Sequence, residues 1–109
     1  FPKGCDDDTL PWGKSGPYLE TKHPYVCHAE LNAVLNANYN LDGCRIYVDL
    51  FPCNECAKVI IQAGLVEVIY LSEIDLTKEY TQASKLMLEM SGVKLRRLLP
   101  TKTTITIEF

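Results

Sequence analysis

The sequence has no apolar run that approaches the roughly 20 residues of a membrane-spanning helix, so we expect no membrane partner. It also has no excess of positive charge, because 11 Lys and Arg residues stand against 14 Asp and Glu residues, for a formal net charge of −3. Proteins that bind duplex DNA or long RNA usually concentrate Lys and Arg, so we expect no nucleic-acid partner. The chain does not begin with Met, and its first residues lack the charged and then apolar pattern of a signal peptide. We therefore expect an N-terminally truncated domain.

The cysteine count does not suggest a disulfide framework. The five cysteines are odd in number, and no secretory signal accompanies them. Disulfide-stapled domains usually carry an even number of cysteines, and free thiols persist in reducing compartments, so we expect a cytoplasmic protein. Cys53 and Cys56 form a C-x-x-C pair, which is typical of a metal or redox site, whereas the other three cysteines stand alone.

The length and composition predict one small globular domain. The 109 residues are 47% apolar and 23% charged, and no repeat or linker divides residues 1–109. Residues 1–24 cannot sustain a helix because prolines recur along them, at Pro2, Pro11, Pro17 and Pro24. We expect this segment to be a structured loop within the domain, anchored to the core by the apolar rings of Trp12 and Tyr18.

Regular periodicity begins after Pro24. Apolar residues at helical spacing predict helices over residues 29–38, 54–63 and 78–90. Runs of β-branched and aromatic residues predict strands over residues 45–51, 66–71 and 93–98, and residues 103–109 alternate like a further strand. Strands that alternate with helices need crossover connections, which produce a largely parallel sheet covered by helices. We therefore predict an α/β fold.

The sequence PCNEC at residues 52–56 is the first of two candidate metal motifs. Cys53 and Cys56, at i and i+3, share one face of a helical turn, so both sulfur atoms can reach one ion at about 2.3 Å. Cys53 is expected where a strand ends and a helix begins, and the unpaired N–H groups at a helix start favour a thiolate. Redox pairs and structural zinc sites use the same spacing, so this motif alone leaves those alternatives open.

The sequence HAE at residues 28–30 narrows the choice. Inside a helix, residues two apart point roughly 200° away from each other, so His28 and Glu30 could not serve one centre there. At a helix start the two side chains can converge. His28, Cys53 and Cys56 would then supply three ligands, the number typical of catalytic zinc with an open fourth position. Water in that position would ionise near pH 7, and Glu30 could move its protons.

Together, H-x-E followed by P-C-x-x-C matches the signature of zinc-dependent nucleobase deaminases. The chain resembles the cytidine deaminase superfamily and, within it, the deoxycytidylate (dCMP) deaminases. The likeness covers nearly the whole chain and is strongest from Tyr25 to Tyr70. It rests on five segments: Gly4 to Asp7 (GCDD), Leu10 to Trp12 (LPW), Tyr25 to Ala33 (YVCHAELNA), Leu50 to Lys58 (LFPCNECAK) and Ile61 to Gly64 (IQAG).

The resemblance implies hydrolytic deamination of dCMP to dUMP, which supplies thymidylate synthesis. Zinc hydroxide would attack ring C4, while Glu30 would pass protons to N3 and to the leaving ammonia. The Pro52 carbonyl and the Ala29 amide would hold the pyrimidine ring. The resemblance further implies a hexamer that is activated by dCTP and inhibited by dTTP, with residues 4–7 near the regulatory site.

The resemblance also implies a cytidine-deaminase-like three-layer α/β/α sandwich around a mixed, largely parallel sheet. In that family a helix and two strands precede the segment that Phe1 begins, and a turn bearing an Asn contacts the sugar. We expect these elements to be missing, which would leave an exposed sheet edge and weak activity or none. No phosphate ligand stands out, and the lysines considered for that role are expected to be solvated: Lys3, Lys14, Lys22 and Lys58.

Two alternatives stay open. The substrate could be another cytosine nucleotide, such as dCTP, or a free nucleoside. The domain could instead be non-catalytic, with zinc holding the fold. A structural zinc site normally has a fourth protein ligand, for which His23, Cys27 and Cys44 are the nearest candidates in the sequence.

Overall fold

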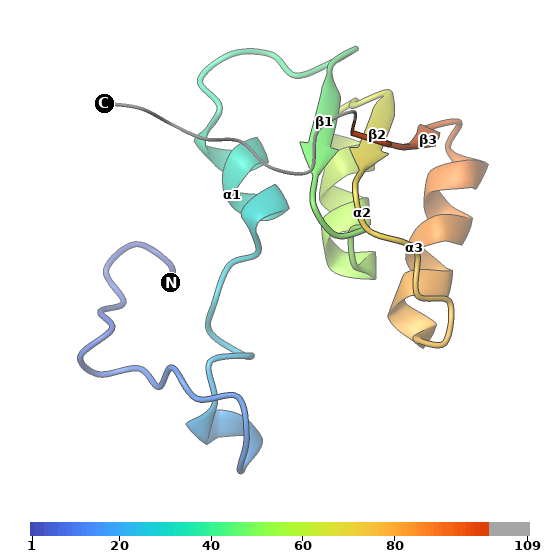
Figure 1. The fold of residues 1–109 in the computed structure, drawn as a ribbon. Coiled ribbons are helices and arrows are strands. Elements are labelled where there is room, and N and C mark those ends of the chain that lie inside the picture. Colours follow the sequence, from blue (N-terminus) through green and yellow to red (C-terminus); the bar gives the residue numbers. More distant parts are fainter. Residues whose placement is uncertain (101–109) are drawn as a thin grey trace, which may run out of the picture.

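The computed structural model describes residues 1–100, in which helices and strands alternate as predicted (Figure 1). The elements are α1 (Ala29–Asn36), β1 (Arg45–Val48), α2 (Asn54–Gln62), β2 (Glu67–Tyr70), α3 (Glu79–Met90) and β3 (Lys94–Arg97). All six predicted elements are present, and their ends are trimmed by up to three residues. The strand predicted over residues 103–109 lies outside the described residues.

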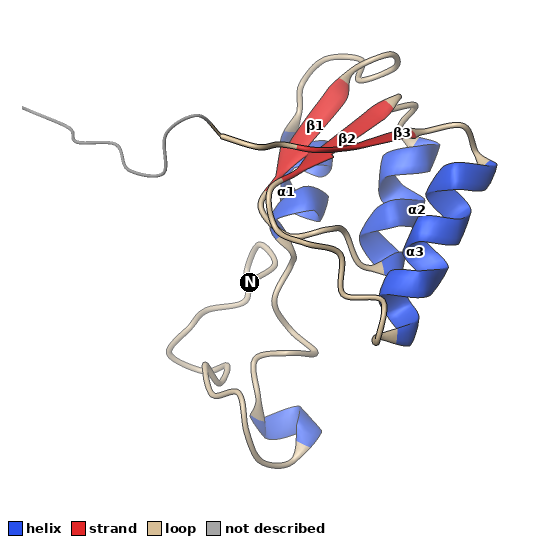
Figure 2. Cartoon of the chain, turned by 45° about the vertical axis from the view of Figure 1, so that its right-hand side comes forward, coloured by secondary structure: helices blue, strands red, loops and turns tan. Residues whose placement is uncertain are grey.

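The three strands form one parallel sheet in the order β1-β2-β3. The register aligns Ile46 with Val68 and Val68 with Leu95, so that apolar side chains from all three strands share one face. The three helices lie against this face, α1 beside α2 and α2 beside α3 (Figures 1 and 2). The α/β fold with a parallel sheet is therefore confirmed, and residues 1–100 supply two layers of the expected three-layer sandwich.

The core lies between the sheet and the helices. Ala57 and Ile60 of α2, Val68 of β2 and Leu88 of α3 are fully buried in one cluster. Val34 of α1 packs against the same cluster, which fixes α1 next to α2. Because tightly packed cores hold side chains in fixed positions, this cluster sets how the starts of α1 and α2 face each other.

Residues 1–28 form a long loop beside this core, with a single 3₁₀ turn at Tyr18–Glu20 (Figure 2). Trp12 and Tyr18 are 58% and 66% exposed, so the prediction that they anchor the loop to the core is wrong. The ring of Phe1 lies 4.7 Å from that of Trp12 and provides locally the contact that we expected from the core. Among residues 1–100, a search of the helices finds no candidate for a membrane-spanning segment.

Candidate metal centre and active-site cleft

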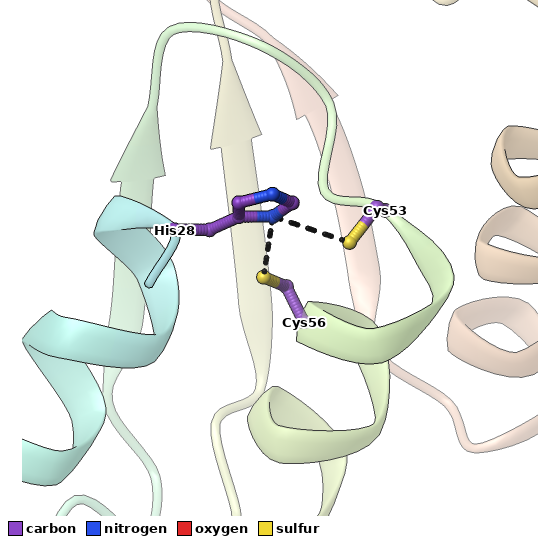
Figure 3. A group of neighbouring side chains, drawn as sticks. All are labelled: His28, Cys53 and Cys56. Carbon is purple, nitrogen blue, oxygen red and sulfur yellow. Dashed lines mark hydrogen bonds between the residues drawn. The ribbon is translucent and has the colours of Figure 1, made fainter. Parts of the chain in front are cut away.

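Two helix starts bring the metal motifs together. His28 is the N-cap residue of α1 and Cys53 is the N-cap residue of α2, and both have extended backbone angles. Their carbonyls accept the first hydrogen bond of each helix, from the amides of Asn32 and Ala57. Neither side chain makes a capping hydrogen bond, so both are free to point toward each other (Figure 3).

The three predicted ligands converge on one point. His28 Nδ1 lies 3.4 Å from Cys53 Sγ and 3.5 Å from Cys56 Sγ, and the three atoms lie within 4.8 Å of one another. Nitrogen and sulfur ligands of one tetrahedral zinc ion, at about 2.0 and 2.3 Å from the metal, would be separated by roughly 3.5 Å. The spacing of these donors therefore fits zinc.

The protonation state of Cys56 depends on whether a cation occupies the centre. Burial, together with the neighbouring Cys53 and Glu30, raises the pKa of the Cys56 thiol to about 12. The protein by itself thus disfavours a thiolate at this place. A divalent cation would reverse this preference, because thiolates bind metals and a nearby positive charge stabilises them.

Glu30 lies beside the donor group without belonging to it. Its Oε2 atom is 3.6 Å from Cys56 Sγ, and the residue sits in the first turn of α1, two positions after His28. The structure thus brings His28 and Glu30 to the same place, as expected for a helix start. A carboxylate in this position can exchange protons with a molecule that occupies the space next to the donors.

A cleft of about 720 Å³ opens beside the donor group. His28, Ala29, Glu30 and Cys53 line it, whereas Pro52 is fully buried and is not among the lining residues. The prediction for Ala29 is thus compatible with its place, and the contact predicted for the Pro52 carbonyl stays a prediction. The volume lies within the range of small-ligand sites.

The far parts of the cleft come from segments that sequence reasoning did not assign to a site. Lys78, Tyr80 and Thr81, at the start of α3, line the cleft together with residues 46–51 and with acidic residues of the loop after β2. The carboxyl ends of parallel strands meet at one edge of a sheet, and ligands bind there. This rule could have predicted that the segments after β1 and β2 line the site. Lys58, by contrast, lies outside the cleft and pairs with Glu55 at 3.0 Å, as expected for a surface lysine.

Comparison with known proteins gives consistent matches. The family model for the cytidine and deoxycytidylate deaminase zinc-binding region matches residues 12–72. The deoxycytidylate deaminase of Mus musculus is 51% identical over 111 residues, which cover 100% of this chain and 62% of the mouse protein. The probable deoxycytidylate deaminase of Drosophila melanogaster is 50% identical over 116 residues, covering 100% of this chain and 57% of that protein. The chain thus spans about three fifths of the length of these curated relatives.

A solved structure shares the fold. The dCMP deaminase of cyanophage S-TIM5 in complex with dCMP and dUMP has a TM-score of 0.59 and 26% identity, covering 82% of this chain and 67% of that chain. The matched family region, residues 12–72, contains all four residues of the donor group and its neighbouring carboxylate. Since the family model covers more than half of the chain and both metal motifs, the chain belongs to the cytidine and deoxycytidylate deaminase family.

Proposed function

We propose that this chain carries the catalytic centre of a hydrolase that converts dCMP and water to dUMP and ammonia, and so supplies thymidylate synthesis. The observation that carries the proposal is the meeting of His28, Cys53 and Cys56 next to Glu30. His28, Cys53 and Glu30 also line one cleft. Three protein ligands are the number used by catalytic zinc, whereas a structural zinc site usually has four.

His28 Nδ1 and the sulfur atoms of Cys53 and Cys56 would hold the zinc ion. Bound zinc would supply a water molecule with a pKa near 7, which provides a nucleophile at neutral pH. Within residues 1–100, neither His23 nor Cys27 nor Cys44 belongs to the donor group, which favours an open fourth position over a structural site.

Glu30 would perform the proton transfers. Its carboxylate would accept a proton from the attacking water and donate it to ring N3 while the water oxygen bonds to C4. It would then take the proton of the new C4 hydroxyl and deliver it to the exocyclic amine. The bond between C4 and the amine then breaks, the C4 carbonyl forms, and ammonia leaves. Ala29, on the cleft wall next to Glu30, is proposed to orient the pyrimidine through its backbone amide, and the Pro52 carbonyl is proposed to do so from the other helix start.

Substitution of Glu30 by Gln tests the proposal, with Glu55→Gln as the matched control. Both glutamates lie in the first turn of a helix, but Glu55 is exposed and pairs with Lys58. We expect Glu30→Gln to lower kcat for dCMP by about 10²- to 10⁴-fold, which is the usual contribution of a residue that transfers protons. Zinc content and the unfolding midpoint should stay unchanged, and Glu55→Gln should retain full activity. Turnover that survives Glu30→Gln would contradict the assignment and favour a non-catalytic domain.

The preferred nucleotide is proposed to be dCMP rather than dCTP or deoxycytidine. Support comes from the names of the relatives and from the dCMP and dUMP bound in the cyanophage structure. Comparison of kcat/KM for the three substrates would decide between them.

We also propose that the protein is cytoplasmic. By analogy with the family, we propose that it forms a homo-hexamer that is regulated by dCTP and dTTP. The five cysteines of the chain are all free, as expected in a reducing compartment. Light scattering with and without each nucleotide would measure the assembly.

A further inference from the structure

The first turn of α1, which carries Glu30 and follows His28, has little support of its own. The helix is 8 residues long and none of these residues is buried, although Val34 in its second half packs against the core. Helices of this length are marginal in water, and helix ends are the parts that fray. His28, at the N-cap, makes no side-chain capping bond within residues 1–100. The order of this turn therefore depends on the segment that enters the helix.

The ring of His28 also lacks an outer support. Among the residues that the structure describes, its hydrogen-bond partners are Cys53 and Cys56, and both lie at Nδ1 (Figure 3). Metal-binding histidines usually donate from the other ring nitrogen to a carboxylate or carbonyl, which fixes the ring. Because residues 1–100 offer no such partner at Nε2, the position of the ring depends on the backbone at His28.

A closed loop over residues 13–22 precedes α1 (Figure 1). The Lys22 amide donates to the Gly13 carbonyl at 2.9 Å, which brings the two ends of the loop together. Inside it, Thr21 is 3% exposed and its hydroxyl donates to the Tyr18 carbonyl at 2.8 Å. Compact loops whose ends meet and whose own side chains fill them are frequently functional.

Tyr25 joins the 13–22 loop to the entry of α1. Its hydroxyl donates to the Leu19 carbonyl at 2.8 Å. The amides of Tyr25 and Val26 both donate to the Lys22 carbonyl, at 3.0 and 3.1 Å. These three bonds fix the backbone up to the second residue before His28. In the described part of the chain, Tyr25 supplies the one side-chain hydrogen bond from residues 23–28 back to the 13–22 loop.

We propose that Tyr25 is a positioning residue for the metal centre. By bonding the entry of α1 to the 13–22 loop, it holds the first turn of the helix so that His28 and Glu30 face the two cysteines of α2. This inference rests on the proposed role of His28 as a zinc ligand. Tyr25 belongs neither to the donor group nor to the cleft wall, so it acts through the backbone that leads to His28.

Tyr25→Phe tests the inference in the protein at its full natural length, with Tyr18→Phe as the matched control. Each variant removes one hydroxyl from the same segment, but the Tyr18 hydroxyl has no hydrogen-bond partner among residues 1–100. Zinc binds only while the first turn of α1 is formed, so a less populated turn weakens the apparent affinity.

Competition with a chromogenic chelator would measure the zinc Kd of each variant. We expect Tyr25→Phe to raise the Kd by about 2- to 10-fold, the range for one net hydrogen bond. Tyr18→Phe should leave it unchanged. Equal zinc affinity in the two variants would overturn the inference.

Amide hydrogen exchange separates positioning from a general loss of stability. In the metal-free Tyr25→Phe protein, the amides of residues 29–31 should exchange faster than in the wild type, whereas the amide of Leu88 in the core should keep its protection. An equal loss of protection at Leu88 would show that Tyr25 only stabilises the whole domain, and the inference would be wrong.

These measurements also separate the inference from the proposed function. If Tyr25→Phe weakens zinc binding while the wild-type protein deaminates no dCMP, the positioning role stands and the proposed function fails. If the wild-type protein deaminates dCMP and Tyr25→Phe binds zinc as tightly as the wild type, the function stands and the positioning role is wrong.

Discussion

Gly64, at the end of α2, offers a quantitative test of how the cysteine-bearing helix is held. Its φ angle is +82°, a conformation that L side chains rarely adopt. A Cβ atom added there would overlap Asp42 Oδ1 and would lie 3.1 Å from Asp42 Cα. The Gly64 carbonyl also accepts a hydrogen bond from the Gly43 amide at 2.9 Å. Gly64→Ala should therefore strain both the backbone and the contact with the turn before β1.

Gly92 supplies a matched control for the backbone contribution alone. It follows α3 as Gly64 follows α2, its φ angle is +83°, and a Cβ atom there would meet nothing within 4 Å. Both amides bond to the carbonyl three residues earlier, at 3.0 Å for Gly64 and 3.1 Å for Gly92. Gly92→Ala should cost about 1–2 kcal/mol for the left-handed conformation.

Gly64→Ala should cost about 1–3 kcal/mol more than Gly92→Ala, because the crowding against Asp42 adds to the backbone strain. Urea unfolding of both variants at one fixed free zinc concentration would measure the difference, since bound zinc then contributes similarly to each. Removal of the Asp42 carboxylate in the Gly64→Ala background should recover part of the loss. Equal losses at Gly64 and Gly92 would refute the reasoning, because they would show that the close approach carries no energy.

Two further predictions concern the metal centre. Cys56→Ser should lower the zinc content well below one ion per chain and abolish turnover, because a serine hydroxyl is not ionised at neutral pH. Metal analysis would measure the zinc content. The control Cys44→Ser, which lies outside the donor group, should retain zinc. In the metal-free protein, the pKa of Cys56 is raised from 9.0 to about 12, so its contribution to stability is complete below pH 9 and is lost as the pH rises toward 12. Urea midpoints should thus fall across that window, and an equal fall in Cys56→Ser would contradict this account.

The sequence was sufficient for the elements because they depend on local spacing. It was sufficient for the donor group because the cysteine spacing was combined with a helix start at His28, 25 residues before Cys53. Periodicity located the six elements, and the i, i+3 spacing of Cys53 and Cys56 followed from helix geometry. The far wall of the cleft could not be obtained in this way. Lys78 and Thr81 are 48 or more residues away from Glu30 along the chain, and only the packing of α3 against α2 brings them to the same cleft.

The loop over residues 1–28 shows the opposite failure. Trp12 and Tyr18 are apolar enough to predict burial, but burial also requires a nearby unoccupied apolar surface, which composition does not reveal. Trp12 instead contacts the ring of Phe1 within the same segment and stays more than half exposed.

The three helix starts explain why the cleft lies where it does. In residues 1–100, the N-cap residues of α1, α2 and α3 are His28, Cys53 and Lys78, and none makes a side-chain capping bond. Ser, Thr, Asp or Asn at such a position typically stabilises a helix by about 1 kcal/mol relative to a residue that does not cap. All three helices lack this stabilisation. The residues at the three N-cap positions, His28, Cys53 and Lys78, all line one cleft. Local rules are broken most often at functional sites. At His28 and Cys53 the missing cap is explained by their proposed role as zinc ligands, and Lys78 places a third uncapped helix start on the wall of the same cleft.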